Sequence, residues 1–553
     1  MATTVEIIAA FLAEAGVGRI YGVPGAGTTL DLIEACRRQQ IEFLLTHHEA
    51  SGAIMAATEG DLTDRPGVCL AAAGSGAASA VSGVAHAFLD RAPLLILTGG
   101  SSRAALRLAP RQLLDHSGLL GWVAKASKTV TAPRAGRLVA WAWGEALAAP
   151  RGPVHIDLPA DEATKGARWH GRSFGRERPP RPSPNGIRTA ARLLGRWGRV
   201  LVIAGLGCRE SGAGRALQKL VEHLGAPLLT TLRAKGVLSE DHPLAAGVFA
   251  GGRLEEDLLS KAEGILAVGL DPVELLPRPR QAGLPVVALA EYAPGRRPYD
   301  PVCELLADLP TSLEALREAL PPGGGWGLAA WATIGKKFKA RARALLAEAS
   351  TARGRTGVPP HRVVELAREI FPRQTIVSVD SGTHALAVAA FWDAYEPKAY
   401  LCSSGLASTG YAMPAAIAAG LVAQDRPVLA FLGDGGFLRS VPDLAMAAWR
   451  RVPLVGIVFV DASLGFSQAQ QQLKRYAPVG VSLGSMDIPK LAESFGALGM
   501  EVEEEEGLRT ALKEATTTSQ PAIIAVRVRP AGYRRMVEVL HGKPEGKKQS
   551  RKA

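Results

Sequence analysis

Two aspartates in the last third of the chain have the spacing and the surroundings of a cation site. Asp434 directly follows the apolar run RPVLAFL and a glycine, and Asp461 ends a second apolar run, VPLVGIVFV, 27 positions later. Each run is typical of a buried parallel strand. If the two strands are neighbours, both carboxylates lie at the same edge of a sheet, where α/β folds bind their ligands. Two hard oxygen ligands beside a glycine turn suit Mg²⁺, which keeps positions open for phosphates.

The turn that carries the first aspartate, Gly433-Asp434-Gly435-Gly436, leads into SVPDLAMAAWRR, where apolar residues recur at helical spacing. This pattern predicts a strand-to-helix turn, whose backbone N–H groups and helix dipole favour an anion. An aspartate would repel that anion unless a cation lies between them. The alternative interpretation is that each aspartate only caps the helix that follows it.

The composition is that of a large globular chain. The 553 residues are 47% hydrophobic and include 61 glycines, which indicates about three domains at ~150 residues each. No apolar run reaches the ~18 residues that span a bilayer, so we expect no membrane partner. The N-terminus lacks the basic region of a signal peptide, and the five cysteines are far apart without metal spacing. A reducing, cytoplasmic location is therefore expected.

The net charge of +12 comes from scattered arginines, a basic linker near 171–186 and a basic tail at 542–553 that we expect to be disordered. There is no basic stripe interleaved with aromatic residues, so we expect no nucleic-acid partner. Strand-like runs alternate with helical ones throughout, which predicts an α/β class of three doubly wound parallel-sheet domains. We expect these domains at 1–170, 187–325 and 355–541, the first and third sharing a plan that differs from that of the second.

The aspartate pair resembles a known motif. Gly433-Asp434-Gly435 followed by Asp461 is similar to the motif of thiamine-diphosphate enzymes, although the family usually has Asn-Asn where this chain has Val460-Asp461. The resemblance implies that Asp434, Asp461 and the backbone carbonyl of Ser463 bind Mg²⁺, which holds the diphosphate. It also implies two thiamine-diphosphate-binding folds that flank a Rossmann-like central domain.

A second segment, IEFLLTHHEASGAIMAATEGDLTDRPGVCL, resembles the family's segment around its essential glutamate. The resemblance implies that Glu49 ends a strand, opens a helix and holds the aminopyrimidine ring of the cofactor through a buried carboxyl group. Without this resemblance, the simpler interpretation of Glu49 is an acidic residue that stabilises the N-terminus of a helix. His48 and His116 lie where the resemblance puts the mouth of the active site, so either could shuttle protons.

Further segments resemble the family's cofactor-binding turns: YGVPGAG, AAAGSGAAS, DSGTHAL and GLASTGYAMPAA, the last being the loop that bends the cofactor. The residue under that bend is usually Met, Leu or Ile, and here it is Thr409. The cofactor-binding residues implied by the resemblance are Pro24, Gly25, Gly74, Gly382, Thr383, His384, Ser408, Thr409, Gly433, Gly435, Gly436, Gly465 and Phe466.

The acetolactate synthase branch of the family is the most similar. RQLLDH stands where that branch has Phe-Gln-Glu, so the resemblance puts Gln112 among the catalytic residues and Ala26, Arg111 and Gln470 beside the substrate. Arg111 replaces a family Phe and Gln470 a family Trp, which favours a polar or anionic substrate and a sister enzyme of the acetolactate synthases.

The function expected from this resemblance is a thiamine-diphosphate-dependent lyase or carboligase that acts on a small 2-oxo acid, as a homodimer or a dimer of dimers with its active sites at the interface. The alternatives are cleavage of a 2-hydroxyacyl-CoA thioester with the same cofactor, and a catalytically degenerate binding protein of this fold. The central segment AGLGCRESG is similar to a dinucleotide loop. The family's flavin-associated stretch GARFDDR reads GLDPVELLPR here, so we do not expect FAD.

Overall fold

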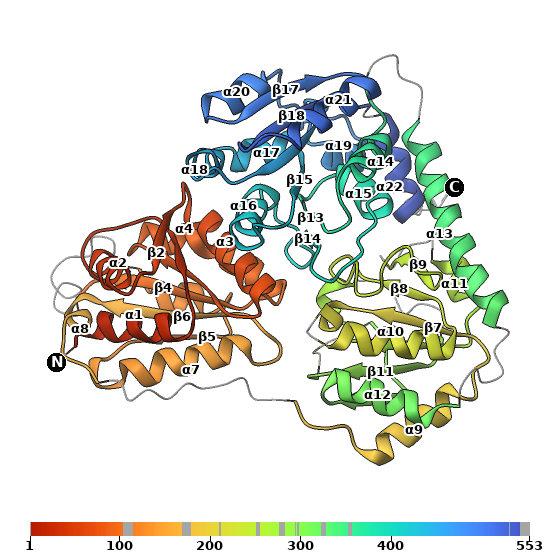
Figure 1. Ribbon diagram of the computed structural model, residues 1–553, viewed down its shortest axis with the longest axis horizontal. Helices are drawn as coiled ribbons and strands as arrows, with labels where there is room; N and C mark the ends of the chain where they lie inside the picture. Colours follow the sequence, from red (N-terminus) through yellow and green to blue (C-terminus); the bar gives the residue numbers. More distant parts are fainter. Residues whose placement is uncertain are drawn as a thin grey trace, which may run out of the picture.

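Three α/β units follow one another along the chain, and each is built on a six-stranded parallel sheet (Figure 1). The first unit is drawn in red and orange, the central one in yellow and green, and the third in cyan and blue. The computed structural model describes residues 2–102, 114–168, 179–209, 212–249, 255–275, 283–293, 295, 298–321, 328–351, 357–529 and 531–541. The expected α/β class with three doubly wound sheets is confirmed.

The first unit has the strand order β2-β1-β3-β4-β6-β5. Its apolar runs form buried strands because helices cover both faces of the sheet. The strands are β1 (Arg19–Gly22), β2 (Glu42–Leu45), β3 (Gly67–Ala71), β4 (Leu94–Gly100), β5 (Ala126–Thr129) and β6 (Pro153–Pro159). The helices are α1 (Thr4–Glu14), α2 (Thr28–Arg38), α3 (Glu49–Thr63), α4 (Ser75–Leu89), α6 (His116–Leu120), η1 (Ala132–Arg134), α7 (Ala135–Leu147) and α8 (Ala160–Ala163).

The third unit repeats this plan, since its order β14-β13-β15-β16-β18-β17 is that of the first unit strand for strand. The strands are β13 (Ile376–Val379), β14 (Tyr400–Cys402), β15 (Val428–Gly433), β16 (Leu454–Val460), β17 (Leu498–Val502) and β18 (Ala522–Arg527). The helices are α13 (Leu328–Ser350), α14 (Pro360–Ile370), α15 (His384–Phe391), α16 (Ala412–Val422), α17 (Asp434–Ser440), α18 (Asp443–Trp449), α19 (Gly465–Leu473), α20 (Ile488–Ser494), α21 (Glu505–Ala515) and α22 (Ala531–His541). The prediction that the first and third units share a plan is confirmed.

The central unit has a different order, β12-β11-β10-β7-β8-β9, which is the arrangement of a Rossmann-like sheet. Its strands are β7 (Val200–Ala204), β8 (Leu228–Thr230), β9 (Ala245–Val248), β10 (Gly264–Val268), β11 (Val286–Ala290) and β12 (Cys303–Leu306). Its helices are α9 (Pro184–Leu194), η2 (Leu206–Arg209), α10 (Ala213–Leu224), α11 (Glu256–Leu259), η3 (Pro272–Glu274) and α12 (Leu309–Ala319). The segment 269–278 stands where the family has its flavin-associated stretch, and the structure describes this segment only as far as residue 275.

The first and third units share one hydrophobic core. Ala53 and Met55 of α3 belong to the same buried cluster as Met413 and Ile417 of α16, and all four side chains are inaccessible or nearly so. This packing fixes the direction of α3, which starts at Glu49, against the third unit. In the part of the chain that the structure describes, no helix combines the length and the apolar character needed to cross a membrane.

Candidate active site

The aspartate pair lies at the ends of two adjacent parallel strands. β15 and β16 pair in register from Val428–Leu454 to Gly433–Phe459, so both chains leave the sheet at the same edge. Asp434 is the first residue of α17, and Asp461 directly follows β16. The predicted strand-to-helix turn is therefore confirmed. The sequence predicted one helix after it, whereas the structure has two, because Pro442 interrupts the path between α17 and α18.

The Asp434 side chain crosses from one strand end to the other. Its Oδ1 accepts the backbone N–H of Gly435 at 2.8 Å, and its Oδ2 accepts those of Ala462 at 2.7 Å and Asp461 at 3.2 Å. Asp461 in turn accepts the backbone N–H and the hydroxyl of Ser463, both at 3.0 Å. The two carboxylates and the Ser463 backbone thus form one connected cluster.

The cluster carries more negative charge than its surroundings favour. Burial and the nearby Asp434 charge raise the pKa of Asp461 to about 7, and burial raises that of Asp434 against the backbone hydrogen bonds that lower it. A buried and a half-buried carboxylate that repel one another are a donor set that a divalent cation stabilises. Among the described residues no group of three or more His, Cys, Asp or Glu side chains is placed to hold a metal, so a cation at this pair would need further oxygen ligands.

Thr383 and Gly465 lie beside this pair. A Cβ placed on Gly465 would lie 2.8 Å from Oγ1 of Thr383 and 3.1 Å from Oδ2 of Asp461, so only glycine leaves this space open. The same Cβ would lie 3.5 Å from the ring of Tyr533, whose hydroxyl interacts with Thr383. The C-terminal helix α22 therefore contributes a buried tyrosine to the site, which the sequence did not indicate by any motif.

His384 lies on the other side of the turn. Its ring is buried, and a Cβ on Gly433 would lie 3.3 Å from Nδ1. Burial lowers the pKa of His384 to about 4, although hydrogen bonds to backbone carbonyl groups raise it. Its Nε2 is buried without a hydrogen-bond partner, which is costly for a polar atom. Such an orphaned atom, in a ring that lies against Gly382 and Gly433, fits a bound polar group.

Asp380 is a second residue that sequence reasoning missed, although it begins the DSGTHAL segment. Its side chain is 1% exposed and accepts backbone N–H groups of the loop that contains Ser408 and Thr409. Burial raises its pKa to about 6, against three backbone hydrogen bonds that lower it. Ser408 donates its N–H to Ser403 Oγ at 3.1 Å, while the Thr409 side chain is exposed.

The first unit supplies a separate group of candidates. Glu49 is the first residue of α3, and the exposed His48 caps that helix by accepting the N–H of Ala50 at Nδ1. A Cβ on Gly76 would lie 3.2 Å from Oε1 of Glu49, so α4 leaves room for this carboxylate through a glycine. The family resemblance implies a buried carboxyl group at Glu49, whereas in this structure the residue is half-buried.

His116, which is expected beside the active-site mouth, lies against the Gly74 turn. It is buried, its Nε2 accepts the N–H of Gly74 at 3.0 Å, and its Nδ1 is 2.8 Å from Oδ1 of Asp157. Because Nε2 accepts, Nδ1 carries the proton and donates it to the carboxylate. Both ring nitrogens are thus engaged in holding the Gly74 turn.

The remaining described candidates are exposed or half-buried. Pro24 and Ala26 are exposed, and Gly25 approaches Ala72 so closely that a Cβ there would be 2.6 Å from the alanine Cβ. In α19, Phe466 is 41% exposed and Gln470 is half-buried. Arg111 and Gln112, and the basic tail 542–553, lie outside the described residues.

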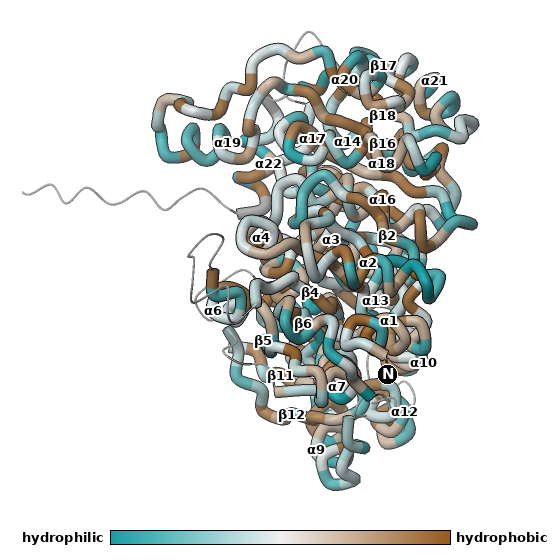
Figure 2. The backbone as a smooth tube through the Cα atoms, turned by 90° about the vertical axis from the view of Figure 1, so that its left-hand side faces the viewer, coloured by the Kyte–Doolittle hydropathy of each residue, from teal (hydrophilic) through white to brown (hydrophobic). Residues whose placement is uncertain are grey.

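The candidates therefore form two sets. One gathers around Asp434 and Asp461 in the third unit, and includes Gly382–His384, Gly433, Gly435, Gly436, Ser463 and Gly465. The other gathers around Glu49 in the first unit. Among the described residues no hydrogen bond or ion pair joins Glu49 to the carboxylate pair. Figure 2 shows α4 of the first unit and α19 of the third facing the same side of the molecule.

Known protein families match the sequence of all three units. The family descriptions "Thiamine pyrophosphate enzyme, N-terminal TPP binding domain", "central domain" and "C-terminal TPP binding domain" match residues 2–119, 187–316 and 380–526. The chain belongs to the thiamine pyrophosphate enzymes.

Within that family the chain is similar to acetolactate synthases. It is 28% identical over 547 residues to an acetolactate synthase of Bacillus subtilis (strain 168), covering 95% of this chain and 92% of that one. It is also 28% identical over 550 residues to a catabolic acetolactate synthase of Raoultella terrigena, covering 96% and 95%. A probable 2-ketoarginine decarboxylase of Pseudomonas aeruginosa is 27% identical over 541 residues, covering 95% and 94%.

Proposed function

We propose that this protein is a thiamine-diphosphate- and Mg²⁺-dependent enzyme that cleaves the bond between the carboxylate and the carbonyl carbon of a small 2-oxo acid. The acyl unit that remains is then protonated or transferred to an acceptor carbonyl. The single observation that carries this proposal is the joining of Asp434 to the Asp461 segment at the ends of adjacent strands, in a chain that retains Glu49.

In this proposal the third unit holds the diphosphate end of the cofactor. Asp434, Asp461 and the carbonyl of Ser463 bind Mg²⁺. The N–H groups of Gly435 and Gly436 lie at the start of α17, where the helix dipole favours an anion. Thr383 and His384 bind the diphosphate from the start of α15, and the buried Nε2 of His384, which has no hydrogen-bond partner, is available to the bound group. The glycines at 433, 435, 436 and 465 let the segments that carry these residues pack closely together.

The first unit supplies the proton chemistry. When bound, thiamine diphosphate supplies a nucleophilic carbon and accepts the electron pair released as carbon dioxide leaves. Glu49 holds a proton beside the aminopyrimidine ring, and the half-buried position of its carboxyl group lets a partner surface enclose it. The family resemblance assigns His48, exposed at the start of α3, and Gln112 to the catalytic residues. The Gly74 turn is held in place by His116.

The substrate pocket is assigned to Ala26, Arg111 and Gln470, which favour an anionic or polar substrate. The relatives named as acetolactate synthases and as a 2-ketoarginine decarboxylase support a 2-oxo acid as the substrate class. Cleavage of a 2-hydroxyacyl thioester is the second candidate function. Assays on 2-oxo acids and on 2-hydroxyacyl thioesters distinguish these two functions. Arg111→Ala should lower kcat/KM on the best 2-oxo acid by about tenfold or more, since one charge-assisted hydrogen bond is lost. Equal rates in both proteins would remove Arg111 from the pocket.

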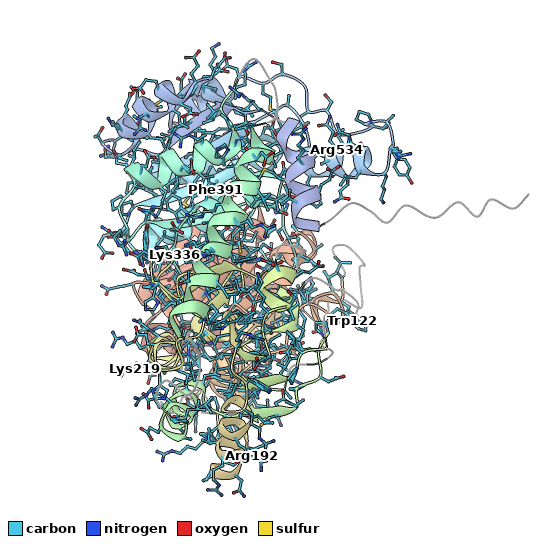
Figure 3. The ribbon with its side chains drawn as sticks, turned by 90° about the vertical axis from the view of Figure 1, so that its right-hand side faces the viewer. Trp122, Arg192, Lys219, Lys336, Phe391 and Arg534 are labelled. Atoms are coloured by element: carbon cyan, nitrogen blue, oxygen red, sulfur yellow. The ribbon has the colours of Figure 1, made fainter. Side chains whose placement is uncertain are left out.

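A second copy of the chain completes the site in this proposal. Large apolar side chains are exposed around α6 and α19, among them Trp122 at 87%, Tyr476 at 63% and Val479 at 73%. Figure 3 shows Trp122 and Arg534 of α22 on one side of the molecule, and Figure 2 shows α6 and α19 on that same side. Exposed apolar surface of this kind marks an interaction site. A homodimer across this face would bring Glu49 of one chain to the carboxylate pair of its partner.

The test of the proposed function starts from the purified protein. Mass spectrometry of the small molecules released on denaturation should find thiamine diphosphate, and a panel of 2-oxo acids with and without acceptor aldehydes and ketones should give carbon dioxide release. Cofactor binding without turnover on any 2-oxo acid or 2-hydroxyacyl thioester would instead support the degenerate binding protein. The proposal would be contradicted if the purified protein released no thiamine diphosphate and turned over none of these substrates.

A further inference from the structure

A buried carboxylate lies beneath the loop that follows β14. Asp380 is the residue directly after β13, and its side chain is 1% exposed. Oδ1 accepts the backbone N–H groups of Ser381 at 2.8 Å, Gly410 at 2.9 Å and Tyr411 at 3.3 Å. Oδ2 also accepts the N–H of Gly410, at 3.0 Å. These bonds join the end of β13 to the last residues of the loop.

The loop needs such an anchor because its backbone is unfavourable. Ala407 has φ +53°, a left-handed conformation that costs free energy for a residue with a Cβ, and Gly410 has φ +89°. The exposed Thr409 lies between these two turns. At the start of the loop Ser404 and Gly405 donate to Oδ1 of Asp90 in the first unit, at 2.8 and 3.1 Å. Asp380 holds the opposite end, directly after Thr409.

The same carboxylate lies against the turn that carries Asp434. A Cβ placed on Gly436 would collide with Oδ2 of Asp380, so the first turn of α17 packs directly on this side chain. A Cβ on Gly410 would lie 3.1 Å from the Cβ of Arg439 in the same helix. Three segments thus converge on Asp380: the end of β13, the loop end at Gly410 and the start of α17.

We propose that Asp380 is the positioning residue that keeps Ser408 and Thr409 in register with the Gly435-Gly436 turn, so that one carboxylate sets the distance between two cofactor-binding segments. The inference rests on the proposed function, which assigns both segments to the cofactor. It assigns Asp380 no contact with the cofactor itself: its oxygens are used by backbone N–H groups, and its effect is transmitted through the backbone.

The test compares Asp380→Asn with Ser378→Ala. Ser378 lies in β13, two residues before Asp380, is fully buried and donates to the carbonyl of Ala412 at 2.7 Å, so its loss removes one buried hydrogen bond just past the loop without touching Gly410. Amide hydrogen exchange in the cofactor-free protein should be about tenfold faster at 408–411 in Asp380→Asn, the factor expected from weakening one charge-assisted hydrogen bond. Ser378→Ala should leave exchange at 408–411 unchanged.

Calorimetric titration with thiamine diphosphate and Mg²⁺ is the second arm. Asp380→Asn should raise the Kd by about tenfold relative to Ser378→Ala, because the same charge-assisted hydrogen bond is weakened. Equal Kd values in the two variants overturn the inference, even if exchange at 408–411 is faster. If the wild type binds no thiamine diphosphate, the proposed function fails, and the exchange arm alone decides whether Asp380 holds the loop.

A second variant covers the case in which Asp380→Asn does not fold. Gly436→Ala pushes on the carboxylate from α17 and should also accelerate exchange at 408–411 in the cofactor-free protein. Unchanged exchange in Gly436→Ala would show that the turn and the loop are not linked through Asp380 and would overturn the inference.

Discussion

Oδ2 of Asp434 accepts the backbone N–H groups of both Asp461 and Ala462, so the first carboxylate of the pair holds the segment that carries the second. The two strand ends that bear them, β15 and β16, are fixed in register by their parallel pairing. The pair is therefore set by backbone geometry, and its charge is left for a cation to balance.

The excess charge predicts a pH dependence of the metal-free protein. Because the pKa of Asp461 is raised to about 7 in the folded state, the folded protein binds more protons here than the unfolded chain between about pH 4 and 7. The contribution of Asp461 to stability is thus fully present below about pH 4, falls progressively between about pH 4 and 7, and is lost above about pH 7.

Asp461→Asn should remove this dependence. With chelator present, the variant should melt higher than the wild type at pH 8 by a few degrees, since about 1 kcal/mol shifts Tm by roughly 2–4 °C at this domain size. Thermal unfolding at pH 5 and pH 8 measures the effect. If the difference in Tm between the wild type and Asp461→Asn were the same at pH 5 and at pH 8, the account would be contradicted.

Asp461→Asn should also retain cofactor binding. An amide oxygen can still ligate Mg²⁺, and the family usually carries Asn at this position, so we expect the Kd to change by less than about tenfold. Asp461→Ala, which removes the ligand, should weaken binding further. If Asn and Ala were equivalent in titrations with Mg²⁺, the side-chain oxygen at position 461 would not be a ligand.

Glu49→Gln should separate binding from proton exchange. The variant should bind the cofactor nearly as the wild type does, but lose activity by about a hundredfold or more, because only a carboxyl group moves the proton on the aminopyrimidine. Deuterium exchange at the reactive carbon of the bound cofactor, followed by NMR after acid quench, measures this step directly. Exchange at the wild-type rate would remove Glu49 from that role.

Mixed dimers should reveal a shared site. Glu49→Ala and Asp434→Ala proteins should each be inactive, but after dissociation and random reassembly about half the dimers are mixed and about a quarter of all sites combine two intact residues. Recovery of about a quarter of the activity is therefore expected. No recovery, with dimers confirmed by light scattering, would place both residues of a site in one chain.

The parts of this structure that a local pattern encodes could be predicted from the sequence. The run VLAFL followed by GDGG predicts β15 and the start of α17 because periodicity, glycine and aspartate all agree there. The shared plan of the first and third units could likewise be predicted. In each of them a helical run, which forms α1 or α14, precedes the first strand of the sheet.

The residues that act through tertiary contacts could not be found in this way. Asp380 and Tyr533 reach the site only because the chain folds back: Asp380 bonds to Gly410, thirty positions on, and Tyr533 approaches Gly465 from the C-terminal helix. His116 is buried between Gly74 and Asp157, partners that no local pattern indicates. A sequence gives no sign of which polar partner a buried histidine finds.

The most direct test of the account is a calorimetric titration of wild type and Asp434→Ala with thiamine diphosphate, each with and without Mg²⁺. The account predicts that the wild type binds tightly only when Mg²⁺ is present, and that Asp434→Ala shows no Mg²⁺-dependent gain, because the diphosphate then faces the sheet edge without a cation held at β15. Equal affinity in the two proteins, or tight wild-type binding that is independent of Mg²⁺, would contradict it.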